Sequence, residues 1–492
     1  MGPLVQLDLL ASIALVSFAL LYWIPLYGLQ TSRLCSSHPL CHRLSHPFDR
    51  GDHQWNSFHS SLPLLGLYFC LNMATKYCLP FRWDKYLRTS FGVLFTVSLH
   101  GYHAIILLLI ASSGYLLAIS SKSLLPSLRI ASYWILALSV LTLKESYRWS
   151  TQIPLVQLLF NRTYSQIYPW HLASNFLVLR MLSFQIDTSC PKNDQLISQS
   201  FIDYCSYVFY WPLYMAGPIN PYHQFVQETH SRRVSFTDAL SKENIFYFAR
   251  LIFSYVLMLI MSYTFPVFAV QRSQILYSLT PPQLAVSLYL TLQIMWLKFL
   301  LIWRTFTLFA RLDGIYAPEN MLRCVSNNYS MSMFWRGWHA SFNKWITMYL
   351  YQPLGGRSNP LAPWVVFGFV AIWHDFDRKL ITWGFLNAFF FMIEIAGGII
   401  SQSYGFDSLS SMTQIAMRCF TGGFFVLVLM GVNLIGYAFG VEGFMHAVEV
   451  FSKFPDGPLT IAMSFLVVCA SVRVMIAKEV EWKSQGKNGP ML

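Results

Sequence analysis

Long, continuous runs of apolar residues recur from one end of the chain to the other. Runs such as 9–29, 251–270 and 420–439 are long enough to cross a bilayer as helices, which takes about 20 residues. The runs do not alternate between apolar and polar positions, so they predict helices and exclude a membrane barrel. Counting them predicts an all-α integral membrane protein with about 10–12 transmembrane or re-entrant helices.

Two segments depart from the simple pattern of spanning helices. The aromatic run 204–225 is interrupted by Pro212, Gly217, Pro218 and Pro221. Backbone groups freed by such breaks are tolerated where protein or a water-filled cavity receives them, so we expect a broken or re-entrant segment that lines a cavity. An ordinary loop that ends a helix is the alternative. Residues 150–190 are expected to form amphipathic helices with aromatic anchors.

The domain organisation predicted from the pattern is simple. The N-terminal run has no basic region before it and no small-residue cleavage site after it, which favours a retained first helix over a signal peptide. The chain shows neither an internal repeat nor a soluble stretch of useful size. We therefore expect a single polytopic membrane domain over residues 1–492.

Composition and charge agree with this interpretation. Hydrophobic residues make up 55% of the chain and charged residues only 11%, against roughly 25% charged in a soluble domain. The net charge of +12 does not indicate nucleic-acid binding in a chain that is mostly embedded in a bilayer. It favours contact with membrane lipids that carry anionic headgroups, or with an anionic substrate.

Polar and ionisable residues crowd into one stretch, 311–375. His374 follows the apolar run 364–373, which would place an imidazole at membrane depth, and His339 lies upstream of it. Ionisable residues at that depth are rare and usually functional, although a histidine that only hydrogen-bonds a neighbouring helix is the alternative. The same stretch contains Asn328 in a formal glycosylation sequon, which we expect to be unmodified because it adjoins membrane segments. Further along, Glu394 lies inside the apolar run 383–400.

Several motifs in this stretch carry a resemblance to a known family. The segments WRGWHASFNK (335–344), YLYQPLGG (349–356) and FVAIWHD (369–375) resemble the membrane-bound O-acyltransferase (MBOAT) family. RLDG (311–314), PENM (318–321) and NNYS (327–330) are similar to the branch that contains Hedgehog acyltransferase and the fungal Gup proteins, and are closer to the Gup side. The resemblance covers about residues 50–440, with 311–375 as the signature.

The resemblance implies both a fold and an activity. Helices would enclose a catalytic chamber in a multi-pass protein of the endoplasmic reticulum membrane. The enzyme would move a long-chain acyl group from acyl-CoA to a lyso-lipid, in the Gup branch the lyso-phosphatidylinositol part of glycosylphosphatidylinositol (GPI) anchors. Alternatives are a protein N-palmitoyltransferase like Hedgehog acyltransferase, or a non-catalytic or glycerol-uptake-related membrane protein.

The residues of the motifs suit acyl transfer. The resemblance implies that His374 is catalytic and that His339 is a second polar site, where other family branches carry Asp or Asn. A buried imidazole is neutral, so His374 can act as general base toward a hydroxyl, while His339 can orient the thioester or stabilise the oxyanion.

The remaining predicted site residues are assigned to substrate binding. Arg336, Lys344 and Arg357 can bind the phosphates of CoA, with snorkelling at the membrane interface as the alternative. Trp335, Asn343 and Asp375 flank the two histidines and complete the predicted substrate-binding set.

One cofactor enters as a hypothesis. Hedgehog acyltransferase binds haem through a cysteine in a matching Arg-Cys-Val context, so the resemblance implies a possible haem with Cys324 as its thiolate ligand. A buried structural cysteine is the alternative. Acyl transfer itself requires no cofactor beyond acyl-CoA as co-substrate, and no metal site is predicted.

Overall fold

The protein is helical throughout the part of the chain described by the computed structural model, residues 3–36, 38, 49, 51–150, 168–190, 198–231 and 236–485. In those residues β-structure is limited to one isolated antiparallel bridge. The principal helices are α1 (Pro3–Phe18), η1 (Ala19–Trp23), α2 (Ile24–Cys35), α3 (His53–Cys78), α4 (Asp84–His100), α5 (Ala104–Ser120), α6 (Pro126–Ser150), α8 (Trp170–Ser189), α9 (Phe201–Val208), α10 (Trp211–Tyr214), α11 (Tyr222–Ser231), α12 (Phe236–Ala239), α13 (Lys242–Thr264), α14 (Val267–Arg272), α15 (Pro281–Asp313), α16 (Met331–Gly337), α17 (Ala340–Ile346), η7 (Thr347–Tyr351), α18 (Ala362–His374), α19 (Arg378–Ser403), α20 (Ser411–Leu434), η10 (Ile435–Phe439), α21 (Gly440–Lys453) and α22 (Gly457–Ser484).

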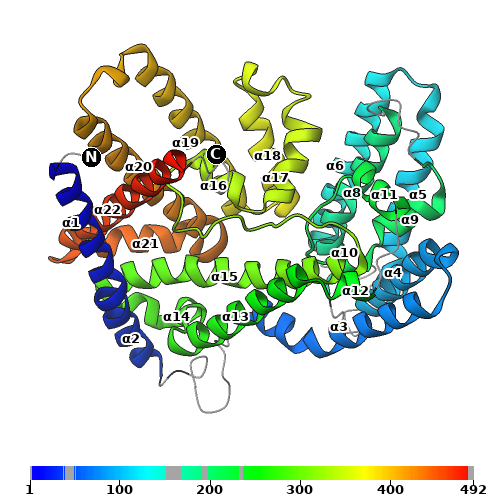
Figure 1. The fold of residues 1–492 in the computed structure, drawn as a ribbon, viewed down its shortest axis with the longest axis horizontal. Coiled ribbons are helices and arrows are strands. Elements are labelled where there is room, and N and C mark those ends of the chain that lie inside the picture. Colours follow the sequence, from blue (N-terminus) through cyan, green and yellow to red (C-terminus); the bar gives the residue numbers. More distant parts are fainter. Residues whose placement is uncertain are drawn as a thin grey trace.

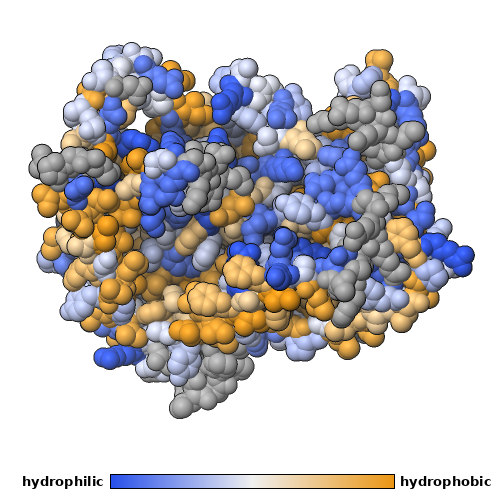
Figure 2. Space-filling model, in the orientation of Figure 1, coloured by the Kyte–Doolittle hydropathy of each residue, from blue (hydrophilic) through white to orange (hydrophobic). Residues whose placement is uncertain are grey.

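Eight stretches of the described chain are long and apolar enough to cross a membrane. Two of them, Phe81–Ser123 and Ser411–Lys453, are 43 residues long and contain more than one helix each, which accounts for the larger number of segments expected from the sequence. Hydrophobic residues gather over α1 and along the edge of the molecule formed by α13 and α15, as Figure 2 shows. The predicted all-α membrane architecture is confirmed.

Helix α15 crosses the molecule and connects its two groups of helices (Figure 1). In the most apolar part of this helix 61% of residues are buried, against 6% in the most apolar part of the stretch Gln6–Cys35, which begins within α1. A capping box of Thr280 and Gln283 begins α15, and Gly314 ends it in the left-handed conformation, with φ of 88°. Glycine adopts that conformation without strain, so the RLDG motif marks the end of the central helix.

The helices form two groups on either side of the site. Figure 1 shows α3–α6 and α8–α11 at one end of the molecule, and α1 with α19–α22 at the other. Helix α1 packs along α22, where Arg473 Nε donates a hydrogen bond to Asp8 Oδ2 over 2.5 Å. Helices α16 to α18 lie between the groups.

Helix α8 corrects one expectation from the sequence. Residues 151–167 lie outside the described part, but α8 is buried around nearly its whole circumference rather than amphipathic. Its polar residues can be buried because they form hydrogen bonds with other groups of the protein. Gln185, for example, donates to Gly114 O over 2.9 Å.

The broken aromatic run is confirmed. It divides into α9, α10 and the start of α11, and the guanidinium of Arg180 on α8 donates to the freed carbonyls of Val208, over 2.8 Å, and Leu213. Met215 and Ala216, just after α10, line the cavity of the candidate site. The break is therefore stabilised from one side by α8 and faces the cavity on the other.

A buried ion pair fixes the end of α15 to α3. Lys76 Nζ lies 2.7 Å from Asp313 Oδ1, and the two side chains are only 6% and 2% exposed. Tyr210 O–H donates to the second carboxylate oxygen over 2.6 Å. Each charged group has its partners, so the cluster holds α3, α10 and α15 together at one point.

This cluster generates a stability prediction. Asp313→Ala should lower the free energy of unfolding by about 3–5 kcal/mol, because it leaves the Lys76 ammonium buried without its counter-charge. The double variant Lys76→Met/Asp313→Leu should recover most of the loss. Thermal unfolding of the purified full chain measures both effects.

The control is an ion pair that water solvates. Lys453→Met removes the pair with Glu449, whose side chains are 71% and 52% exposed, and should change stability by no more than about 1 kcal/mol. If Asp313→Ala were as mild as Lys453→Met, the cluster would not hold these helices together.

Candidate active site

His339 lies at the junction of α16 and α17 in an unusual backbone conformation. Among the described residues it is the only one other than glycine with positive φ, at 48° with ψ of 49°. A side chain in the left-handed region costs free energy and persists only where surrounding structure holds it. The conformation therefore marks His339 as a constrained position.

The constraint comes from the loop before α16. Leu322 N donates to Gly337 O and Ala340 N donates to Asn320 O, each over 3.0 Å, on either side of the bridge between Met321 and Trp338. The side chain of Asn320 also accepts a hydrogen bond from Ser341 N over 3.0 Å. Asn320 thus caps α17, for which His339 provides no side-chain cap.

The imidazole of His339 is packed but keeps one nitrogen without a partner. The ring stacks on Trp303, with centroids 4.6 Å apart and planes inclined by 15°, and the residue is 7% exposed. Its Nε2 has no hydrogen-bond partner among the described residues. Buried polar atoms are normally paired, so an unpaired nitrogen at this position needs an explanation.

A second short helix, α16, is positioned by a carboxylate inside the bundle. Glu394 of α19 accepts hydrogen bonds from Met331 N over 2.5 Å and Ser332 N over 3.2 Å. Ser330 Oγ accepts a third from Met333 N over 3.0 Å. The acid noted in the apolar run 383–400 therefore holds the first turn of the helix that leads to His339.

His374 is the last residue of α18, and Lys144 holds that end of the helix. Lys144 Nζ lies 3.3 Å from His374 O, 3.4 Å from Trp373 O and 2.9 Å from Asn175 Oδ1. The lysine is 1% exposed. A cation at the C-terminus of a helix satisfies carbonyls that have no partner within the helix.

Asn175 adds further contacts from α8. Its Nδ2 lies 3.5 Å from His374 O, and its backbone carbonyl accepts a hydrogen bond from Trp373 Nε1 over 2.9 Å. The ring of His374 packs edge-on against Trp383 and Tyr437, at centroid distances of 6.1 and 5.5 Å. The histidine is therefore placed by α6 and α8 through its backbone and by α19 and η10 through its ring.

Both histidines line one cavity of about 490 Å³. Of the residues predicted from the sequence, Trp335 and Asn343 line it with them. Apolar residues from α1, η1, α15, α20 and α22 form much of the remaining wall. The structure thus brings together the two imidazoles and a space large enough for part of an acyl chain.

The other predicted substrate-binding residues do not line this cavity. Arg336, Lys344 and Arg357 are exposed, and Asp375 follows the end of α18 as its cap residue. Lys344 interacts electrostatically with Glu228 of α11. A substrate group that contacts these cations would have to lie outside the cavity.

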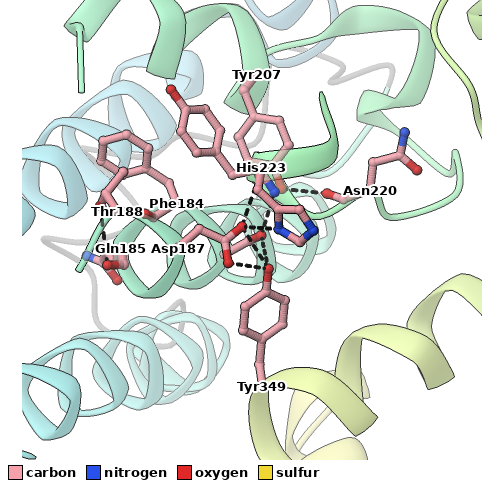
Figure 3. A network of polar contacts seen from close by, with 10 residues as sticks. Phe184, Gln185, Asp187, Thr188, Tyr207, Asn220, His223 and Tyr349 are labelled. Atoms are coloured by element: carbon pink, nitrogen blue, oxygen red, sulfur yellow. Dashed lines mark hydrogen bonds and ion pairs between the residues drawn. The ribbon is translucent and has the colours of Figure 1, made fainter. Parts of the chain in front are cut away.

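The YLYQP motif lies in a different polar network, shown in Figure 3. Tyr349 O–H lies 2.9 Å from both carboxylate oxygens of Asp187 and 2.8 Å from Ser183 Oγ. His223 donates to Asp187 Oδ2 from its backbone N–H over 3.0 Å, and its Nδ1 lies 2.9 Å from the same oxygen. None of these four residues lines the cavity, so the network joins η7 to α8 and α11.

Cys324, the predicted haem ligand, has a protein partner in the structure, and its role as a haem ligand stays a prediction. Burial raises the pKa of its thiol above the usual value. The thiol contacts Gln293 Oε1 over 3.6 Å, and Cys324 is not among the residues that line the cavity. No step of the chemistry below depends on haem.

Sequence reasoning missed the residues that position the site. Lys144 carried a usable signal, because it is a cation at the end of the apolar run 126–144. A charge in a membrane segment usually has a partner within the protein. Asn175 carried none, because one amide in a mixed helix is common. Asn320 was noticed only as part of a motif, without its capping role.

Comparison with known proteins places these features in a family. The model of the MBOAT, membrane-bound O-acyltransferase family, matches residues 121–404. The chain is 31% identical to membrane-bound O-acyltransferase GUP1 of Saccharomyces cerevisiae over 473 residues, 88% of this chain and 81% of that protein. It is 29% identical to GUP2 of the same yeast, over 90% of this chain and 81% of that protein.

A more distant relative extends the comparison. Protein-cysteine N-palmitoyltransferase HHAT of Mus musculus is 26% identical over 39% of each chain. The family model spans more than half of the chain, both yeast relatives cover most of it, and the helices are those of a multi-pass membrane protein. The chain therefore belongs to the membrane-bound O-acyltransferase family.

Proposed function

We propose that this acyltransferase moves a long-chain acyl group from acyl-CoA to a lyso-lipid, with His374 as general base. The observation that carries the proposal is the shared cavity of His339 and His374. A base and a polar group that face one buried space can act on the same substrate atom.

The walls of the cavity support a lipid as one of the substrates. Val16 of α1, Leu20 and Trp23 of η1, and Val467 and Met475 of α22 line it. The stretch that contains α1 lies at the periphery of the bundle. An apolar wall made by an outer membrane helix suits an acyl chain that enters from the bilayer.

The reaction transfers the acyl group from the thioester of acyl-CoA to the acceptor hydroxyl, which becomes an oxygen ester. Neutral His374 takes the proton of the acceptor hydroxyl while the hydroxyl oxygen attacks the thioester carbonyl carbon. His339, protonated on Nε2, donates a hydrogen bond to the oxyanion that forms. When the tetrahedral intermediate collapses, the C–S bond breaks and the imidazolium of His374 returns its proton to the CoA sulfur.

The nucleotide end of CoA would lie outside this cavity. Its phosphates are too strongly hydrated for an apolar space, and charges buried without partners cost free energy. Arg336, Lys344 and Arg357 are exposed and remain candidates for charge-assisted hydrogen bonds to these phosphates.

The acceptor proposed is the lyso-phosphatidylinositol part of GPI anchors, in the endoplasmic reticulum membrane. The Gup-like motifs and the similarity to GUP1 and GUP2 over most of the chain support this choice over a protein acceptor. The whole chain, 1–492, would form one catalytic membrane domain, with 311–375 contributing both histidines.

The general-base assignment predicts that His374→Ala lowers turnover by at least about 10²-fold, because a positioned base contributes about 10²–10⁴-fold. His339→Ala should cost less, since it removes a stabilising contact and not the base. Transfer of labelled acyl groups by the purified full chain measures both. Equal losses would mean that the two histidines act as one unit.

A matched control is His53→Ala, at an exposed position that does not line the cavity. This variant should keep normal turnover. Near-normal activity of a well-folded His374→Ala protein would exclude His374 as the base.

Lys144 gives a second prediction, as a positioning residue for His374. Lys144→Met should lower kcat by about tenfold or more with little change in KM, because small displacements of a reacting group are costly. Lys298→Met is the matched control: Lys298 is also buried, but pairs with Asp52 over 3.1 Å. If both variants lost equal stability and equal kcat, Lys144 would have only a structural role.

The acceptor is tested by competition between substrate classes. Labelled acyl-CoA is supplied with either lyso-GPI or a peptide that has a free N-terminus, and label is expected in the lipid. Label only in the peptide would assign the protein to the N-palmitoyltransferase type. Label in lysophospholipids of every headgroup would retain the chemistry but overturn the anchor specificity.

A further inference from the structure

Three arginines lie around the ring of Tyr247, where the start of α13 meets the end of α15. The two helices pack along each other (Figure 1). The guanidinium carbons of Arg250 and Arg311 lie 5.3 and 4.6 Å from the centroid of this ring. The third cation, Arg304, shares the carboxylate of Glu319 with the hydroxyl of Tyr247. The arrangement therefore brings several cations close to a single aromatic side chain.

Only Arg304 among these cations has a carboxylate partner in the described part of the chain. Its Nε lies 3.3 Å from Glu319 Oε2, which also accepts the hydroxyl of Tyr247 over 3.4 Å. The side chains of Arg250 and Arg311 make no hydrogen bond or ion pair with any described residue, and the interactions that they make are with aromatic rings. A guanidinium has five N–H donors and no acceptor. Two cations therefore keep their donors for water or a ligand.

The position of Arg250 is unusual for a cation without a charged partner. It lies inside the candidate span Lys242–Thr264, at an exposed position. Phe246 and Phe253, one turn before and one turn after it, are 65% and 71% exposed, so Arg250 belongs to a face of α13 that meets the bilayer. Its guanidinium carbon lies 5.3 Å from the ring of Phe246, toward the start of the helix and the membrane surface. A charge at the edge of the hydrocarbon is costly unless an anion or water receives it.

Snorkelling alone would explain the direction of the Arg250 side chain. It does not explain the second cation, because Arg311 comes from the last turn of another helix and also lacks a carboxylate partner among the described residues. Guanidinium groups form charge-assisted, often bidentate hydrogen bonds with phosphate. Basic sites between membrane helices bind anionic headgroups. A lipid phosphate is therefore a ligand that suits both cations.

We propose that Arg250 and Arg311 bind the phosphate of an anionic phospholipid, whose chains lie along the exposed face of α13. Neither arginine lines the cavity of the two histidines, so this lipid site is separate from the candidate active site and does not depend on the proposed function. CoA carries phosphates of the same chemistry, but it arrives from water and not from the bilayer. The exposed apolar side chains on either side of Arg250 favour the lipid.

The test measures lipid binding by the purified full chain in a neutral detergent. The rise in Tm with added phosphatidylserine, which is anionic and is not the proposed acceptor, gives an apparent Kd. Arg250→Gln/Arg311→Gln should weaken this binding by about tenfold or more, the loss expected when charge-assisted hydrogen bonds are removed. Phosphatidylcholine, whose phosphate is balanced by a cation, should bind the wild-type protein more weakly and be little affected by the variant.

The control variant Arg82→Gln/Lys453→Gln removes the same charge from exposed positions elsewhere and should keep the wild-type affinity. Equal losses in this control and in the arginine double variant would reduce the effect to general surface charge and overturn the site. If the arginine double variant did not fold, Arg250→Gln alone, at an exposed position, should still weaken binding by about threefold or more.

CoA is the second probe, and it separates the two sources of phosphate. Its affinity should be the same in the wild-type protein and in Arg250→Gln/Arg311→Gln. A loss of affinity for CoA alone would overturn the lipid assignment and give these arginines to the nucleotide. Unchanged affinity of Arg250→Gln and of the double variant for phosphatidylserine would overturn the proposal, and so would a wild-type protein that bound phosphatidylserine no more tightly than phosphatidylcholine.

Discussion

The ammonium of Lys144 lies where no bulk water can solvate it, so its position is decided by the acceptors that the protein supplies. Those acceptors are Asn175 of α8 and the last carbonyls of α18. Helix α18 packs against α19 on its other side. The contact therefore connects the group of helices around α8 to the group around α19. It does so at the backbone of His374, whose side chain is the proposed base. An uncompensated charge would be costly, which makes this geometry strongly preferred over a rotated or frayed helix end.

The buried acids of the structure differ from His339 in their hydrogen bonding. Asp313, Glu394 and Asp187 are buried or half-buried acids, and each accepts hydrogen bonds from well-placed donors. They stabilise contacts between helices and line no part of the cavity. His339 is different, because it lines the cavity and its buried Nε2 is unpaired among the described residues. A ligand that satisfied this nitrogen would recover the cost of leaving it unpaired.

The hydrophobic runs were sufficient to predict a helical membrane protein, because a bilayer allows few other structures. The prediction that His339 and His374 belong to one site came from the resemblance of the motifs. No rule of sequence spacing shows that residues of separate helices line one cavity. Trp335, His339 and Asn343 recur every fourth residue and all line the cavity. The sequence offered a signal at Lys144 but not its partners, and the burial of α8 could not be predicted, because burial of polar residues depends on partners far along the chain. Arg336, Lys344 and Arg357 were assigned to the site because of their charge, and in the structure they lie outside the cavity.

The backbone of His339 shows why two motifs of the signature act as one unit. Its left-handed conformation costs about 1–3 kcal/mol, and glycine would adopt it freely but would carry no imidazole. The hydrogen bonds of Asn320 to Ala340 and Ser341, together with the bridge at Met321, offset that cost. The PENM segment therefore stabilises the turn that places the imidazole against Trp303 with Nε2 unpaired. If the segment were removed, the favourable geometry of α16 and α17 would be a continuous helix, and the ring would leave the position in which it faces the cavity.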